Sequence, residues 1–225
     1  MRLIVMLPGI YDKAGDFVSE GFVKDLRASG IDADVLIPEA HYGYYEARDV
    51  DVRLETDIFA PARAQGYKEI WIVGVSLGGL GSLLYSAKFP DAVTGIFLIA
   101  PFPGTDKVLA EIEHSGGALA WSRSPQAQGG GERHALLWLA AMGSMQEAKT
   151  NNAAHVPQIF MGTGKSDRLV EGQKMLASLL PATHVNFVEG GHDWATWRLL
   201  WRSFLDKGPW AGEAARQAHL DRIKL

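Results

Sequence analysis

One serine of the sequence stands among neighbours that suit nucleophilic catalysis. Ser76 lies between Gly74 and Gly78 in the pattern Gly-x-Ser-x-Gly, after the apolar run 70–75 and before a stretch of small residues. This pattern is typical of a nucleophile elbow, a sharp turn from a strand into a helix. Glycine is needed on both sides because a side chain there would collide with neighbouring backbone. We expect the turn to expose the Ser76 hydroxyl and to aim the Leu77 N–H at a developing oxyanion.

A serine nucleophile needs a base and a carboxylate that orients the base. His192 follows the last predicted strand in Glu-Gly-Gly-His-Asp, where the two glycines allow the loop to turn back over the sheet edge. Asp167 follows the preceding predicted strand in Gly-Thr-Gly-Lys-Ser-Asp. The order Ser76, Asp167, His192 is the chain order of nucleophile-elbow enzymes. We therefore expect these three side chains to act together.

Each of these interpretations has an alternative. The elbow pattern also fits a glycine-rich turn with an incidental serine. His41 is the second choice for the base, and Asp167 could instead cap a helix that begins at Arg168. Asp193 is too close in sequence to His192 to reach its ring and is expected to cap the final helix.

Other chemistries find little support in the sequence. Gly164-Lys165-Ser166 resembles the end of a phosphate-binding loop, but Ile159 stands where that motif requires glycine. Asp49 and Asp51 have no histidine pair at metal-binding spacing, so we expect no metal and no cofactor. The chain has no cysteine, which excludes disulfides and a thiolate nucleophile.

Composition is typical of one globular domain. Of the 225 residues, 47% are hydrophobic and 21% are charged, and the formal net charge is −4. This charge leaves no basic footprint for nucleic acid, so we expect a small-molecule substrate. The first apolar run is too short to span a membrane and lacks a cleavage site, so a cytoplasmic protein is expected.

The apolar pattern predicts strands that alternate with helices. The predicted strands are 3–7, 33–37, 70–75, 93–100, 156–161 and 184–188; the predicted helices include 16–29, 50–65, 106–113, 132–149, 168–180 and 194–205, with an aromatic loop at 41–45. Such alternation predicts an α/β fold, a three-layer sandwich around a mostly parallel sheet of about six strands. If the strand order reverses between the first and third strands, the turn 8–11 lies beside Ser76.

These motifs make the chain resemble the α/β-hydrolase superfamily, and within it the small serine esterases. The resemblance rests on Gly-Val-Ser-Leu-Gly at 74–78, Gly-Lys-Ser-Asp at 164–167 and Gly-Gly-His-Asp-Trp at 190–194. It implies that Ser76 is the nucleophile, His192 the base and Asp167 its orienter. It also implies that the backbone N–H groups of Leu77 and Ile10 form the oxyanion hole.

The resemblance covers about 1–103 and 154–206 as the core of one domain spanning 1–225. Many members carry His-Gly after the first catalytic strand where this chain has Pro8-Gly9, and the two leading antiparallel strands of the family are not expected here. The segment 104–153 stands where the family inserts its cap. Its apolar residues would face an acyl pocket or pack on the core: Trp121, Leu136, Leu137, Trp138 and Met142. We expect 207–225 to form an appended helix, packed on its own core or on a second subunit.

The expected activity is ester hydrolysis through an acyl-enzyme on Ser76. Tyr11, Phe102 and Trp194 each stand beside a catalytic loop and are expected to line the substrate pocket. Acyl transfer, thioester hydrolysis and C–C bond hydrolysis would use the same three residues. A binding protein without catalysis is the alternative from another class, because a fold does not fix a function.

Overall fold

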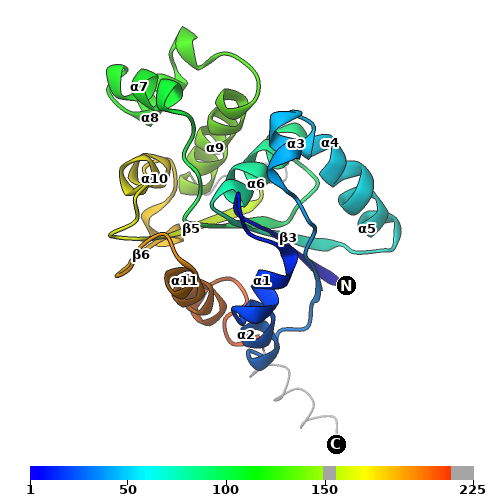
Figure 1. The fold of residues 1–225 in the computed structure, drawn as a ribbon. Helices are drawn as coiled ribbons and strands as arrows, with labels where there is room; N and C mark the ends of the chain where they lie inside the picture. The colour runs from blue at the N-terminus through cyan, green and yellow to red at the C-terminus, as the bar shows by residue number, and fades with distance from the viewer. Residues whose placement is uncertain (149–155, 214–225) are drawn as a thin grey trace, which may run out of the picture.

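The computed structural model describes residues 1–148 and 156–213. Within them, six parallel strands form one sheet in the order β2-β1-β3-β4-β5-β6 (Figure 1). The strands are β1 (Arg2–Leu7), β2 (Asp34–Leu36), β3 (Glu69–Val75), β4 (Gly95–Ile99), β5 (Gln158–Gly164) and β6 (Val185–Val188). The predicted parallel sheet and its strand-order reversal between β1 and β3 are confirmed.

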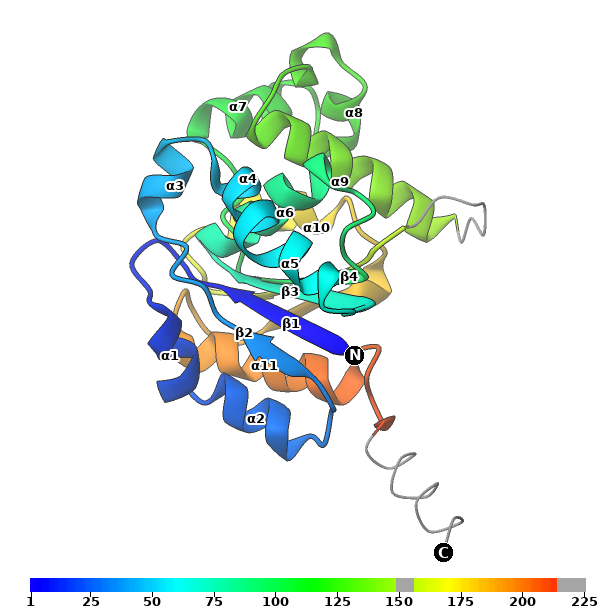
Figure 2. The same cartoon turned by 90° about the vertical axis from the view of Figure 1, so that its right-hand side faces the viewer.

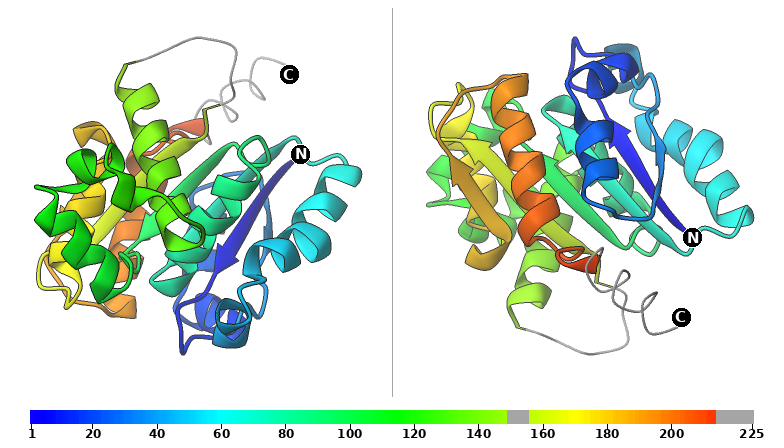
Figure 3. Two further views of the ribbon diagram at one scale, coloured as in Figure 1. Left: turned by 90° about the horizontal axis from the view of Figure 1, so that it is seen from above. Right: turned by 90° about the horizontal axis from the view of Figure 1, so that it is seen from below.

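Helices cover both faces of the sheet, as Figures 2 and 3 show. Because both faces are covered, β1, β3 and β4 are almost continuous runs of buried residues. One face carries α1 (Ala14–Ser19), α2 (Phe22–Ala28) and α11 (Trp194–Lys207). The other carries α3 (Tyr42–Glu46), α4 (Val50–Leu54), a π-helical turn (Glu55–Phe59), α5 (Ala60–Ala64), α6 (Leu77–Lys88), α9 (Glu132–Glu147) and α10 (Val170–Ala177). The predicted three-layer sandwich is confirmed.

Two predictions of local structure were wrong. The single helix predicted over 16–29 is divided into α1 and α2, because Gly21 adopts a left-handed φ of 86° and a Cβ there would lie 2.7 Å from the Arg198 guanidinium. The aromatic stretch 41–45 is not a loop but enters α3. His41 caps that helix, where its Nδ1 accepts a hydrogen bond from the Gly43 N–H at 3.2 Å.

The segment between β4 and β5 forms a helical layer above α6. It contains α7 (Asp106–His114), α8 (Ala118–Ser122), a 3₁₀ turn (Pro125–Ala127) and α9, and α7 and α8 lie beyond α9 from the sheet (Figure 2). Trp121, Leu136 and Trp138 are 1%, 2% and 8% exposed and belong to the same apolar cluster as the core of that face. These side chains therefore pack on the core, which favours the second of the two arrangements expected for this segment.

A charged cluster joins α2 to α11. The Asp25 carboxylate accepts hydrogen bonds from Arg198 Nε at 2.7 Å and Arg202 Nε at 2.9 Å. The hydrogen bond from Arg198, together with that from Arg202, holds the pKa of the Asp25 carboxyl well below its usual range in spite of its partial burial. Beyond α11, Trp210 is 2% exposed and its ring meets Trp71 at 4.9 Å. The rest of the predicted C-terminal helix, 214–225, lies outside the described residues, as does 149–153 of the predicted cap.

Candidate active site

Ser76 forms the turn between β3 and α6. Its φ of 50° and ψ of −113° are unusual for a residue with a side chain, and only 7% of its surface is exposed. The Ser76 N–H donates to the Ile99 carbonyl at 3.0 Å, and the Ser76 carbonyl accepts from the Phe102 N–H at 2.8 Å. Such a strained conformation persists only where surrounding contacts impose it, and it is common at functional sites.

The two flanking glycines are required by contact with backbone. A Cβ on Gly74 would lie 2.4 Å from the Gly78 carbonyl oxygen, and a Cβ on Gly78 would lie 2.2 Å from the Leu7 carbonyl oxygen. This close approach of α6 to the end of β1 brings the loop after β1 beside the elbow. A Cβ on Gly9 would lie 3.4 Å from Ser76 Cβ. The loop after β1 therefore lies beside Ser76, as predicted.

The loops that follow β5 and β6 bring an imidazole and a carboxylate to Ser76. His192 Nε2 lies 2.9 Å from Ser76 Oγ, and His192 Nδ1 lies 2.7 Å from Asp167 Oδ2. The two loops are tied together, since the Ser166 N–H donates to the Gly190 carbonyl at 2.9 Å. Three side chains separated by up to 116 positions thus form one hydrogen-bonded chain.

Asp167 is suited to orient the histidine. It is 2% exposed, and its Oδ1 accepts the Leu169 N–H at 2.8 Å while its Oδ2 faces His192. Burial raises the pKa of the Asp167 carboxyl, but hydrogen bonds from His192 and Leu169 outweigh it and leave the pKa below the usual value. An ionised Asp167 holds the proton on His192 Nδ1 and leaves Nε2 free to accept from Ser76.

The residues considered as alternatives to His192 and Asp167 have other roles in the structure. His41 caps α3 and stacks on Tyr44 at 4.4 Å. Asp193 caps α11, where its Oδ1 accepts the Thr196 N–H at 2.9 Å, as expected. Asp167 is not the cap of a helix beginning at Arg168, since α10 begins at Val170 with Leu169 as its N-cap; its Oδ1 accepts the Leu169 N–H in the preceding turn.

The two predicted oxyanion donors belong to segments that adjoin Ser76. Leu77 begins α6, and the first N–H groups of a helix have no partner within it. Ile10 lies in the loop after β1, next to Gly9. Among the described residues, neither the Leu77 N–H nor the Ile10 N–H has an acceptor in a turn, a loop or a side chain. Both predicted oxyanion donors are therefore unpaired in the structure.

The three predicted pocket residues have different surroundings. Phe102 is half-buried and adjoins the elbow through its backbone. The Tyr11 side chain projects into solvent and is 88% exposed. The Trp194 ring packs on Phe17 at 5.2 Å, and its Nε1 donates to Asp12 Oδ1 at 3.1 Å. The sequence analysis did not identify Asp12 as a residue near the site. The only indication in the sequence is that an acidic residue stands two positions after Ile10.

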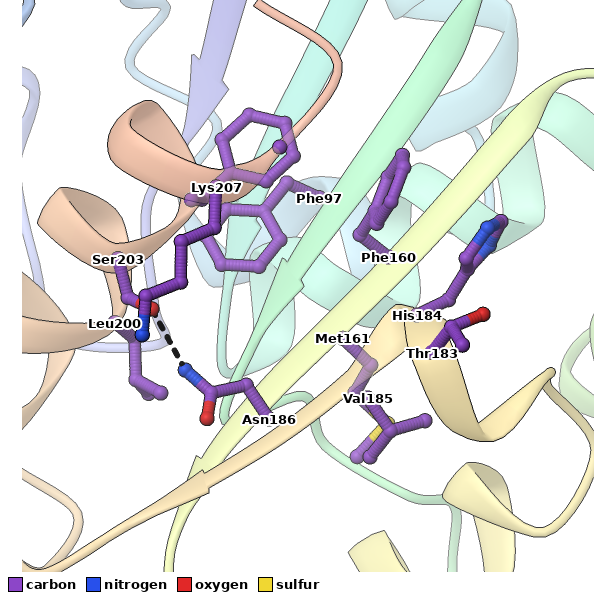
Figure 4. Close-up of a pocket in the computed structure, with 12 residues that line it drawn as sticks. Phe97, Phe160, Met161, Thr183, His184, Val185, Asn186, Leu200, Ser203 and Lys207 are labelled. Carbon is purple, nitrogen blue, oxygen red and sulfur yellow. Dashed lines mark hydrogen bonds between the residues drawn. The ribbon is translucent and has the colours of Figure 1, made fainter. Parts of the chain in front are cut away.

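Two cavities of the described structure lie away from Ser76. One, of about 180 Å³, lies between β5, β6 and α11, where Asn186 Nδ2 donates to Ser203 Oγ at 3.0 Å (Figure 4). The other, of about 300 Å³, lies between α8 and α9 and is lined by residues such as Leu119 and Leu137. Within the described ranges, no three histidine or acidic side chains gather as a metal site would require. No helix in them has the length and apolarity to cross a bilayer.

Comparison with known proteins finds one family model that is similar to part of the chain. Residues 45–142 match the family model described as the alpha/beta hydrolase fold. No curated protein matches the sequence.

Several solved structures share the fold at low sequence identity. The fluorophosphonate-binding serine hydrolase F of Staphylococcus aureus is 13% identical, with a TM-score of 0.58 over 91% of this chain and 81% of that one. The S-formylglutathione hydrolase of the same organism is 14% identical, with a TM-score of 0.57 over 91% and 79%. A ferulic acid esterase is 17% identical, with a TM-score of 0.55 over 90% and 83%. The parallel sheet, the matched segment and these structures agree that the chain has an α/β-hydrolase fold.

Proposed function

We propose that the protein is a serine hydrolase that cleaves a small-molecule ester, as carboxylesterases do, through an acyl-enzyme on Ser76. The observation that carries this proposal is the hydrogen-bonded chain from Ser76 through His192 to the buried Asp167. The similar solved structures include proteins named as a serine hydrolase, a hydrolase of S-formylglutathione and an esterase of ferulic acid. Their names support ester or thioester chemistry and leave the substrate of this chain open.

The proposed reaction starts when His192 Nε2 takes the proton of Ser76 Oγ and the oxygen attacks the ester carbonyl. The Leu77 and Ile10 N–H groups would donate to the resulting oxyanion, which is worth about 3 kcal/mol of barrier for each donor. His192 then returns the proton to the leaving alcohol, and the acyl group remains on Ser76. A water molecule, deprotonated by His192, attacks the acyl-enzyme and releases the acid.

Labelling with a fluorophosphonate probe tests this proposal. Such probes modify an activated serine, so we expect the wild type to be labelled at Ser76 and both Ser76→Ala and His192→Ala to remain unlabelled. Ser86→Ala is the matched control, because Ser86 in α6 is also buried and its Oγ has no hydrogen-bond partner among the described residues. Hydrolysis of p-nitrophenyl esters of increasing chain length then follows, and the released acid separates hydrolysis from acyl transfer. A folded wild type that takes no label and cleaves no ester contradicts the proposal.

A further inference from the structure

A carboxylate that the proposed mechanism does not use connects the two loops on either side of Ser76. Asp12 lies in the loop after β1, two positions beyond Ile10. Its Oδ1 accepts the indole N–H of Trp194 at 3.1 Å, and Trp194 begins α11 two positions after His192. One hydrogen bond therefore spans 182 positions of sequence between the predicted oxyanion loop and the histidine loop.

Asp12 also closes its own loop around Ile10. The Asp12 N–H donates to the Gly9 carbonyl at 3.3 Å, and the Gly9 backbone hydrogen-bonds the carboxylate in return. A Cβ on Gly9 would lie 2.3 Å from Asp12 Oδ2 and 3.4 Å from Ser76 Cβ, so the carboxylate and the nucleophile adjoin the same glycine. These contacts occupy the Gly9 N–H and carbonyl and leave the neighbouring Ile10 N–H without an acceptor among the described residues.

The Trp194 end of the contact is held firmly. Its ring meets Phe17 at 5.2 Å, Phe22 at 5.5 Å and Trp197 at 5.0 Å, each edge to face. Trp197 in turn meets the His192 ring edge to face at 5.1 Å. Because edge-to-face packing of aromatic rings restricts their orientation, the indole N–H is a fixed donor beside the histidine loop.

We propose that Asp12 is a positioning residue that holds the Ile10 N–H at the oxyanion through its hydrogen bonds to the loop after β1 and to Trp194. This inference rests on the proposed ester hydrolysis and adds a residue to it. An oxyanion donor acts only where its position is set in advance, and a displacement of about 1 Å can cost about 100-fold in rate. The loop after β1 has no regular structure of its own to set that position, and the Asp12–Trp194 contact supplies it.

The test is a double-mutant cycle with Asp12→Ala and Trp194→Phe, measured by p-nitrophenyl butyrate hydrolysis. Trp194→Phe keeps an aromatic ring but removes the indole N–H donor together with part of the ring volume, and the second loss is matched in the control below. We expect each single variant to lower kcat at least tenfold with KM changed less than threefold, since the contact acts on the transition state. The double variant should be no slower than the slower single variant, because both changes break one contact. Asp12→Asn keeps an acceptor oxygen and should recover part of the loss.

Trp210→Phe is the matched control. Trp210 is buried in the same aromatic layer, and its Nε1 has no hydrogen-bond partner among the described residues. We expect the kcat of Trp210→Phe to stay within twofold of the wild-type value. This should hold even if its melting temperature falls by as much as that of Trp194→Phe.

Four outcomes overturn the inference. Undiminished kcat in Trp194→Phe, or losses that multiply in the double variant, would remove the positioning role while ester hydrolysis stands. An equal kcat loss in Trp210→Phe would reduce the effect to general destabilisation. A wild type that neither reacts with the fluorophosphonate nor cleaves esters removes the proposed function, and the role of Asp12 with it.

Discussion

Replacement of Asp167 by asparagine exchanges one carboxylate oxygen for an NH₂ group and removes a charge, with almost no change of volume. In the native protein, Asp167 Oδ1 accepts the Leu169 N–H at 2.8 Å and Oδ2 accepts from His192 Nδ1 at 2.7 Å. An amide has one acceptor oxygen and one NH₂ group. Because the Leu169 N–H needs an acceptor, the amide oxygen of asparagine would face Leu169 and the NH₂ group would face His192.

This orientation reverses the tautomer of the histidine. His192 Nδ1 would have to accept from the amide, so the imidazole proton would move to Nε2, which then could not accept the proton of Ser76. Loss of the correct tautomer in a serine–histidine–aspartate site costs about 10⁴-fold in kcat. We therefore expect Asp167→Asn to lower kcat about 10³- to 10⁴-fold, equivalent to about 4–5.5 kcal/mol of barrier. KM should change little, because Asp167 lies behind the histidine and away from bound substrate.

Steady-state hydrolysis of p-nitrophenyl butyrate at pH 7.5 measures this effect, with Asp193→Asn as the control. Asp193 adjoins His192 in sequence but caps α11 through Thr196, and asparagine is an equally good capping residue. Its activity should stay within about threefold of the wild type, since neither residue of that cap touches the imidazole. Retention of a tenth or more of the wild-type kcat in folded Asp167→Asn would refute the tautomer argument. An equal loss in Asp193→Asn would refute the assignment of the carboxylate.

Three further predictions concern stability and the pocket. Asp25→Asn should lower the free energy of unfolding at pH 7 by about 1 kcal/mol, since solvent screens this partly exposed cluster. The arginines of α11 depress the pKa of Asp25, so its contribution is present above the unfolded pKa of about 3.9 and is lost as the pH falls through the folded value. The difference in unfolding free energy between the wild type and Asp25→Asn, measured by denaturation, should be smaller at pH 3 than at pH 7. An equal difference at the two pH values would contradict this prediction. Gly78→Ala should destabilise the fold by about 3 kcal/mol, because the added Cβ meets backbone of β1. Gly15→Ala in α1 is its control and should be neutral or stabilising, since a Cβ there meets nothing within 4 Å. Similar melting temperatures of the two variants would contradict the steric argument. Phe102→Ala should raise KM for longer acyl esters, and unchanged kinetics would exclude Phe102 from the pocket.

The sequence by itself determined the parts of this protein that depend on short-range sterics and periodicity. Alternating apolar strands and helices predict the parallel sandwich, because each parallel crossover needs a helix and both sheet faces are then buried. The glycines around Ser76 predict the elbow. A Cβ on Gly74 would meet the Gly78 carbonyl four positions away, whereas the contact that requires Gly78 is with Leu7 of the adjacent strand β1. Strand ends followed by Asp167 and His192 also predict one shared sheet edge, and the structure brings these residues within hydrogen-bonding distance there.

Only the tertiary structure decided how distant segments pack. The break between α1 and α2 lies at Gly21, whose left-handed φ of 86° is set beside the Arg198 guanidinium of α11, a neighbour that no local pattern contains. The sequence pattern of α9 fits apolar residues that line a pocket as well as residues of the core. Packing of α9 on α6 places these residues in the core. The hydrogen bond that Trp194 donates to Asp12 joins the start of α11 to the loop after β1. Such contacts depend on how whole helices settle against the sheet, and local propensity carries no information about that.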